Sequence, residues 1–256
     1  MGRFSWIRDG DQQGRPSGRL TISGTPCSTQ ATVTPIPAAG PCVRPGEIIQ
    51  ECALGLVRIR QDGTRLAFAA PPVTRSTPTP ELLTQVAAAL GLHMQHIQAA
   101  QWLDNGPLWL GLLLDSEETV LTLTPNHAEL KCLGLKVGVA LMDKAQAAPS
   151  LIARSNREAR AFGHRAGAPE TVEDNTQVLV CAFAAAGGVN EDPVTGSFNA
   201  SLAQWLIADG LAPANYTATQ GTCLGRFGQV YISQDHAGQV WGGGDSVTCI
   251  EGIVRL

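Results

Sequence analysis

The sequence lacks several features that would define a class of function at once. Its seven cysteines form no C-x-x-C pair and are odd in number, so we expect a reducing compartment and neither a disulfide framework nor a zinc site. The net charge is −4 and Lys and Arg form no run, which argues against binding to nucleic acid or an anionic membrane. No apolar run is long enough to span a bilayer, and residues 1–19 contain no apolar signal core. We therefore expect a cytoplasmic protein with no nucleic-acid or membrane partner.

The composition is typical of a folded, loop-rich protein. Of the 256 residues, 44% are hydrophobic and 16% are charged, a balance far from that of a disordered chain. This length accommodates one large domain or two modest ones. Several strands and one long helix occur before about residue 98 and again after it, so the pattern predicts an α+β protein with two similar lobes, 1–98 and 99–256.

Local patterns predict individual elements. Alternating apolar residues around the turn Gln61-Asp62-Gly63 predict a hairpin within 46–70, and helical spacing over 81–92 predicts a helix that Gly91 ends. A second helix is expected over 196–209, a surface insertion over 144–176 and a hairpin turn at 241–245. The remaining patterns predict strands, on both sides of the turn at 104–107 and over 118–125, 135–143, 177–183, 229–241 and 247–256.

The segment GGVNEDPVTGSFNASLAQWL, residues 187–206, carries the clearest chemical signal. Asp192 follows Glu191 and precedes Pro193, and a helix is expected to begin with Ser197, or Gly196 beside it, as its N-cap. The free amides of a helix start attract anions, and Thr195, Gly196 and Ser197 would supply donors to a carboxylate. An ordinary helix cap beside a loop acid fits the same residues.

The motif EDPVTGS, followed by QGTCLGRFGQVYI at 220–232, resembles the PhzF family of phenazine-biosynthesis-like isomerases. The similarity runs from about residue 44 almost to the end. It implies a diaminopimelate-epimerase-like fold of two pseudo-symmetric lobes, each a curved, mostly antiparallel sheet around a central helix. It also implies acid/base proton transfer on a small carboxylic or amino acid without a cofactor, with a homodimer as a candidate assembly. The residues that the resemblance assigns are Asp192 and Ser197 for catalysis and Thr195, Gly196, Gly225, Arg226 and Gly228 for substrate binding.

The N-terminal region departs from the family's pattern. The family has an acid/base Glu before a GHP motif whose His contacts the substrate, but here the matching stretch, 18–31, has Thr25 in place of that His. The first Glu in the chain is Glu47 and the first His is His93. We therefore expect the first lobe to be incomplete, residues 24–43 to be out of register through a frame change, and activity to be reduced or lost. The alternative function is that of a non-catalytic homologue that binds small anions or dimerises.

Other reactive side chains have simpler expected roles. Relatives on this fold use two cysteines as racemase bases, but Ser197 occupies the equivalent second position and Cys27 has no evident partner. His93 and His96 are expected to be surface or satisfied residues. Cys181, Cys223 and Cys249 are expected in the core, and the aromatic residues expected in the core or at an interface are Trp102, Trp109, Trp205 and Trp241.

Overall fold

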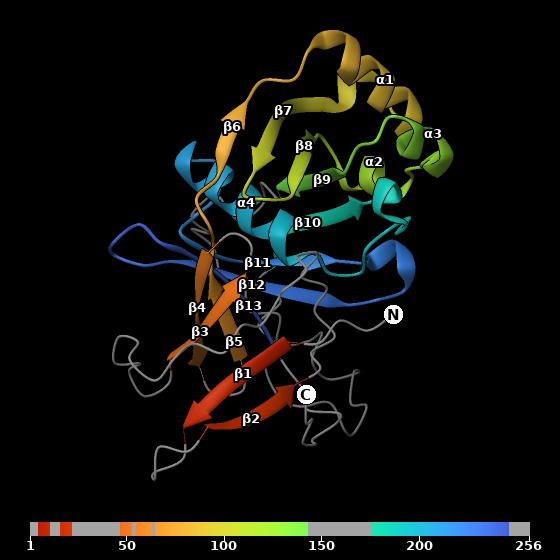
Figure 1. Ribbon diagram of the computed structural model, residues 1–256. Coiled ribbons are helices and arrows are strands. Elements are labelled where there is room, and N and C mark those ends of the chain that lie inside the picture. Colours follow the sequence, from red (N-terminus) through yellow and green to blue (C-terminus); the bar gives the residue numbers. More distant parts are fainter. Residues whose placement is uncertain are drawn as a thin grey trace, which may run out of the picture.

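The computed structural model describes residues 5–10, 16–21, 47–52, 55–62, 65–142 and 176–245. The expectations for residues 24–43, for the closing strand at 247–256 and for nearly all of the insertion at 144–176 lie outside these ranges. Within them the chain is α+β, and its strands form one two-stranded and one eleven-stranded sheet (Figure 1).

The large sheet runs in the order β3-β4-β5-β13-β12-β11-β10-β9-β8-β7-β6. Only β8–β9 and β10–β11 pair in parallel, so the sheet is mostly antiparallel, as predicted. The expected lobe boundary, residue 98, falls within β7, and the division into two lobes remains a prediction. The strands are β1 Ser5–Gly10, β2 Pro16–Thr21, β3 Glu47–Cys52, β4 Gly55–Asp62, β5 Arg65–Ala69, β6 Thr74–Ser76, β7 Ile97–Asp104, β8 Leu108–Leu114, β9 Val137–Met142, β10 Thr176–Phe183, β11 Asn215–Gln220, β12 Gly228–Gln234 and β13 Val240–Asp245.

Two long helices confirm the sequence patterns. Thr79 caps α1 by accepting a hydrogen bond from the Leu82 amide, and Gly91 ends it at φ 71°, a conformation that favours glycine. The α-helices are α1 Pro80–Leu90, α2 Glu117–Leu121, α3 His127–Cys132 and α4 Gly196–Ala208, and the 3₁₀ turns are η1 Met94–His96, η4 Ala185–Gly187 and η5 Thr222–Leu224.

The strand predicted over 118–125 is wrong. Residues from this stretch form α2, because Ser116 caps the helix by accepting a hydrogen bond from the Thr119 amide at 3.2 Å, and Glu117 and Glu118 lie in its first turn. The alternation of Thr with Val and Leu is typical of a strand and led to the wrong prediction. The observed helix α2 has five residues, and only Val120 among them is buried.

The hairpin turn predicted at 241–245 is also wrong, since these residues belong to strand β13. Gly242 and Gly243 pair with Phe68 and Ala67 of β5. A Cβ atom on Gly242 would lie 3.3 Å from the Phe68 ring, and one on Gly243 would lie 3.0 Å from Ala67 Cβ. The glycines therefore allow close packing within a strand.

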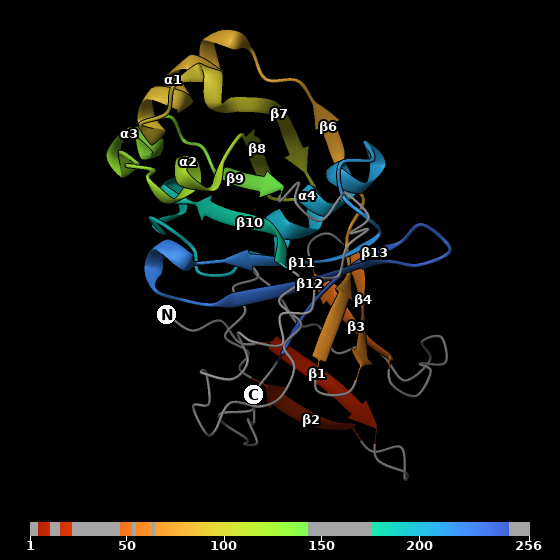
Figure 2. The same cartoon turned by 180° about the vertical axis from the view of Figure 1, so that it is seen from behind.

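Helix α4 is the centre of the main core. Strands from β7 to β13 all contribute buried side chains to the cluster that contains Phe198, Leu202 and Trp205 of this helix. The opposite face of β8–β10 packs against α1, α2 and α3, which lie together away from β3–β5 (Figures 1 and 2). The sheet thus surrounds α4, and the buried Trp109 and Trp205 confirm the expectation for these aromatics.

Candidate functional site

Helix α4 begins at Gly196, as predicted, but its N-cap lies one or two residues earlier than predicted. Thr195 is the N-cap, with extended backbone angles of φ −117° and ψ 96°, and Ser197 is the second helical residue. The Thr195 amide donates to Gln220 Oε1 at 3.1 Å, so it serves the fold and is not a free donor. The backbone amides that could bind a ligand at the start of α4 are therefore those that follow Thr195, because they have no acceptor within the helix.

A buried glutamine holds the loop in front of this helix. Gln220, at the end of β11, is fully buried, and its Nε2 donates to the Asp192 carbonyl at 2.7 Å and to Thr195 Oγ1 at 2.9 Å. Its Oε1 accepts from the Thr195 amide and from Asn199 Nδ2, the latter at 2.7 Å. One side chain therefore fixes both ends of the turn from Asp192 to Thr195.

Asp192 is the acid that this network positions. Only 8% of the residue is exposed, and its amide donates to the Ala182 carbonyl at 2.9 Å, which ties the loop to β10. Burial raises the pKa of the Asp192 carboxyl above its ordinary value, while hydrogen bonds from the Thr195 hydroxyl and the Val194 amide partly offset the rise. A carboxyl with a raised pKa can hold or release a proton closer to neutral pH.

Ser197 is also buried, at 8% exposed, and contacts the β7–β8 hairpin. Trp109 Nε1 donates to Ser197 Oγ at 3.1 Å, and Asn105 Nδ2 donates to the Ser197 carbonyl at 2.9 Å. Asn105 Oδ1 is buried and has no hydrogen-bond partner among the described residues. The DNGP turn thus positions the start of α4, a role that the hairpin pattern did not reveal.

The structure brings the two sequence motifs together. Gly221, at φ 86°, lies so close to Pro193 that an added Cβ would be 2.9 Å from the Pro193 carbonyl oxygen. Gly228 packs equally closely on Pro193 and also on Val194. The glycines of the QG-x₃-GRxG segment therefore allow this turn to pack against the EDPVTGS loop.

The remaining candidate residues differ in their exposure and in their contacts. Gly196 is partly exposed near the Phe68 ring. Gly225 ends η5 with open space around it, and Arg226 is exposed, its amide donating to the Gly221 carbonyl at 2.9 Å. The turn is thus placed beside the loop, but no described contact joins Arg226 to Asp192 or Ser197.

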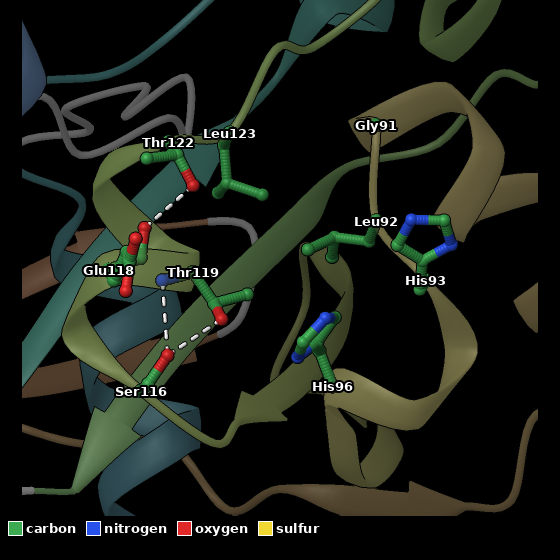
Figure 3. Close-up of a pocket in the computed structure, with 9 residues that line it drawn as sticks. All are labelled: Gly91, Leu92, His93, His96, Ser116, Glu118, Thr119, Thr122 and Leu123. Carbon is green, nitrogen blue, oxygen red and sulfur yellow. Dashed lines mark hydrogen bonds between the residues drawn. The ribbon is translucent and has the colours of Figure 1, made fainter.

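A separate hollow of about 370 Å³ lies between the end of α1 and α2 (Figure 3). His93 and His96 line it, together with Ser116, Glu118 and Thr119 of α2 and its cap. His96 Nδ1 lies 2.8 Å from Asp115 Oδ2, which agrees with the expectation of a satisfied surface histidine. None of the EDPVTGS residues lines this hollow.

Comparison with known families decides what these motifs belong to. A family model described as "PhzC-PhzF: Phenazine biosynthesis-like protein" matches residues 27–252. The chain belongs to the PhzC-PhzF family. The match begins inside the segment 24–43, whose register we expected to be altered. A relative from Schizosaccharomyces pombe, "Antisense-enhancing sequence 1", is 26% identical over 255 residues, which cover 93% of this chain and 76% of that protein.

Solved structures of PhzF-family proteins share the fold. A PhzF-family protein from Enterococcus faecalis matches with TM-score 0.54 and 21% identity over 84% of this chain and 67% of its own. One from Bacillus anthracis matches with TM-score 0.56 and 14% identity over 82% and 69%. A protein from Pseudomonas aeruginosa described as a predicted epimerase gives TM-score 0.55 and 17% identity over 86% and 69%. The epimerase-like α+β fold is therefore confirmed, and no helix in the described part of this PhzF-family chain is long and apolar enough to cross a bilayer.

Proposed function

We propose that this PhzF-family protein is a cofactor-independent isomerase that moves a proton on a small carboxylic or amino acid. The observation that carries the proposal is the arrangement of Asp192, a buried carboxyl with a raised pKa, in a rigid loop directly before the start of α4. The family match supports it, and the two motifs EDPVTGS and QG-x₃-GRxG pack on one another here.

Each group has a distinct proposed role. The amides at the start of α4 hold the substrate carboxylate, since they carry partial positive charge and lack intrahelical acceptors. Asp192 accepts the proton from an adjacent carbon and returns it, which requires a carboxyl whose two protonation states are both accessible. Ser197 orients the substrate, and Trp109 fixes its hydroxyl through the 3.1 Å hydrogen bond.

Gly225, Arg226 and Gly228 form the wall of the proposed site next to the loop. The Gly228 backbone supports Pro193 and Val194, and the exposed Arg226 is free to approach a carboxylate from the solvent side. Substitution of Arg226 is therefore expected to weaken substrate binding without lowering stability.

Hydrogen–deuterium exchange at carbon tests the proposal. The protein is incubated in D₂O with a panel of small α-amino acids and cyclic unsaturated carboxylic acids, and label at carbon is followed by NMR. Enzyme-dependent incorporation supports an isomerase. A ligand that raises the melting temperature but never acquires label would instead favour a small-anion-binding homologue and would overturn the catalytic proposal.

A further inference from the structure

Three potential metal ligands from distant parts of the sequence meet beside the proposed site. Cys181 Sγ, Cys223 Sγ and a carboxylate oxygen of Glu191 all lie within 4.8 Å of one another. Cys181 is buried, Glu191 is partly buried and Cys223 is exposed. The exposed position of Cys223 corrects the expectation that it lies in a core strand, because Gly221 turns the chain out of β11 into η5.

The topology explains why the two thiols converge. Strands β10 and β11 are parallel neighbours, with Val180 opposite Gln220, so the carboxyl ends of both strands lie at the same edge. Val180 faces α4, and the next residue, Cys181, points to the other face of the sheet. Cys223 follows β11 by three residues in η5, which places it at that edge.

Glu191 completes the cluster from the loop that returns after β10. A bridge between Ala184 and Val189 reverses the chain, and the Asp192 amide bonds to the Ala182 carbonyl, so Glu191 is held over the end of β10. Glu191 Oε1 is buried without a hydrogen-bond partner among the described residues, and the neighbour of this carboxyl group is the Cys181 thiol, which is only a weak donor. A buried carboxylate oxygen without a donor is costly, and a cation is one of the few groups that would satisfy it.

We infer that Cys181, Glu191 and Cys223 bind one divalent cation of the zinc class. Two thiolates and one carboxylate are ligands that Zn²⁺ accepts, and three protein ligands leave a fourth position for water on the exposed Cys223 side. In a tetrahedral site with Zn–S near 2.3 Å, ligand atoms are about 3.5–3.8 Å apart. The separations in the cluster, which are 4.8 Å at most, therefore need to shorten by no more than about 1 Å.

Charge explains why a cation suits this cluster better than no partner. A divalent ion would balance the charge of two thiolates and one carboxylate that lie this close together. The proposed proton transfer uses none of these three side chains, although Glu191 is the first residue of the EDPVTGS motif.

The ion would join three segments that support the proposed site. It would link β10, the residue before Asp192, and the turn after Gln220, and so it would clamp both motifs at one point. This inference goes beyond the proposed function, and its test does not depend on activity.

Zinc titration of the metal-free, 256-residue chain tests the site, with a non-thiol reductant present and a chromophoric chelator as competitor. We expect one Zn²⁺ per chain with Kd below about 1 μM, and affinity at least tenfold weaker for Cys223→Ser and Glu191→Gln. Cys132→Ser, an exposed cysteine on α3 outside the cluster, is the matched control and should bind like the parent. With Co²⁺, thiolate-to-metal charge-transfer absorption should appear in the parent and in Cys132→Ser and should be weaker in Cys223→Ser at the same Co²⁺ concentration.

Two results would overturn the inference. One is equal zinc affinity in the parent, Cys223→Ser and Glu191→Gln, which would place any metal on other cysteines of the chain. The other is a parent that binds no zinc when reduced and forms a Cys181–Cys223 disulfide in air, detected by peptide mass as the loss of two hydrogens. Since Cys223 is exposed, its variant should fold, and circular dichroism checks this for each protein.

Discussion

Trp109 Nε1 and Ser197 Oγ are joined by a 3.1 Å hydrogen bond across 88 positions of sequence. The bond connects strand β8 to the first turn of α4, and the Trp109 ring also packs on Phe198 with ring centroids 5.3 Å apart. The orientation of the Ser197 hydroxyl, which we propose to contact substrate, is therefore set by a core aromatic.

Trp109→Phe should lower the rate of carbon exchange by about tenfold, because Ser197 Oγ loses its donor and becomes free to rotate. The stability loss should be about 1–3 kcal/mol from the smaller ring. Trp205→Phe is the matched control, since Trp205 is equally buried in α4 but donates to Asp209, at the other end of the helix. Equal loss of exchange in both variants would mean that packing alone, and not the Ser197 contact, matters.

Gln220→Leu should destabilise the protein by at least about 2 kcal/mol, because it leaves the Thr195 amide and the Asp192 carbonyl buried without partners. Urea denaturation measures this, and Gln234→Leu, in a partly exposed strand end, provides the comparison. A Gln220 variant as stable as the parent would show that the loop does not depend on this network.

Gly138→Ala should cost about 1–3 kcal/mol, since the new methyl group would overlap the Phe198 ring at the centre of the core. Gly244→Ala is the control within the same sheet, because its Cβ would be 3.8 Å from its nearest neighbour, the Gln229 carbonyl oxygen. That substitution should change stability by less than about 0.5 kcal/mol. If the two variants melt alike, α4 does not pack against β9 as described.

Asp209 should make stability depend on pH through its contact with β6. Arg75 donates to both carboxylate oxygens at 2.7 Å, and these hydrogen bonds lower the pKa of Asp209 below its ordinary value. A lowered folded-state pKa gives stability that is complete above the unfolded value, near 4, and is lost as pH falls through the folded value.

Asp209→Asn should therefore be less stable than the parent by about 0.5–1 kcal/mol at pH 7, with the difference shrinking below about pH 4. Thermal melts from pH 7 to pH 2.5 measure this difference in stability. In a protein that already carries Arg75→Met, the substitution Asp209→Asn should have little further effect on stability. A difference that is constant across this range would contradict the pairing.

Much of the fold follows from local patterns, but the site does not. The β4–β5 hairpin and the end of α1 at Gly91 were predictable, because a turn residue or a cap residue marks each of them directly in the sequence. Helices α2 and α3 were missed because each spans fewer than two turns, too short for an apolar period; the better signal was the cap, Ser116 before α2 and Asn126 with Glu129 at α3.

The groups that support the site were hidden for a different reason. Gln220 belongs to a motif that is visible in the sequence, but its four hydrogen bonds depend on the position of β11 beside the loop. Likewise Cys181 and Cys223 are 42 positions apart, without the short spacing that marks a metal site, and only the parallel pairing of β10 and β11 brings them together. Motifs identified Asp192 and Ser197, whereas tertiary contacts identified what holds them.

The most direct measurement of the central claim is carbon exchange in D₂O by the parent and by Asp192→Asn, with Glu117→Gln, an exposed carboxyl on α2, as the control. The account predicts label at carbon with the parent and with Glu117→Gln, and a rate at least about 100-fold lower with Asp192→Asn, since a positioned acid/base group contributes 10²–10⁴ in rate. Exchange that proceeds equally well in a folded Asp192→Asn variant would contradict the claim that this carboxyl carries the proton.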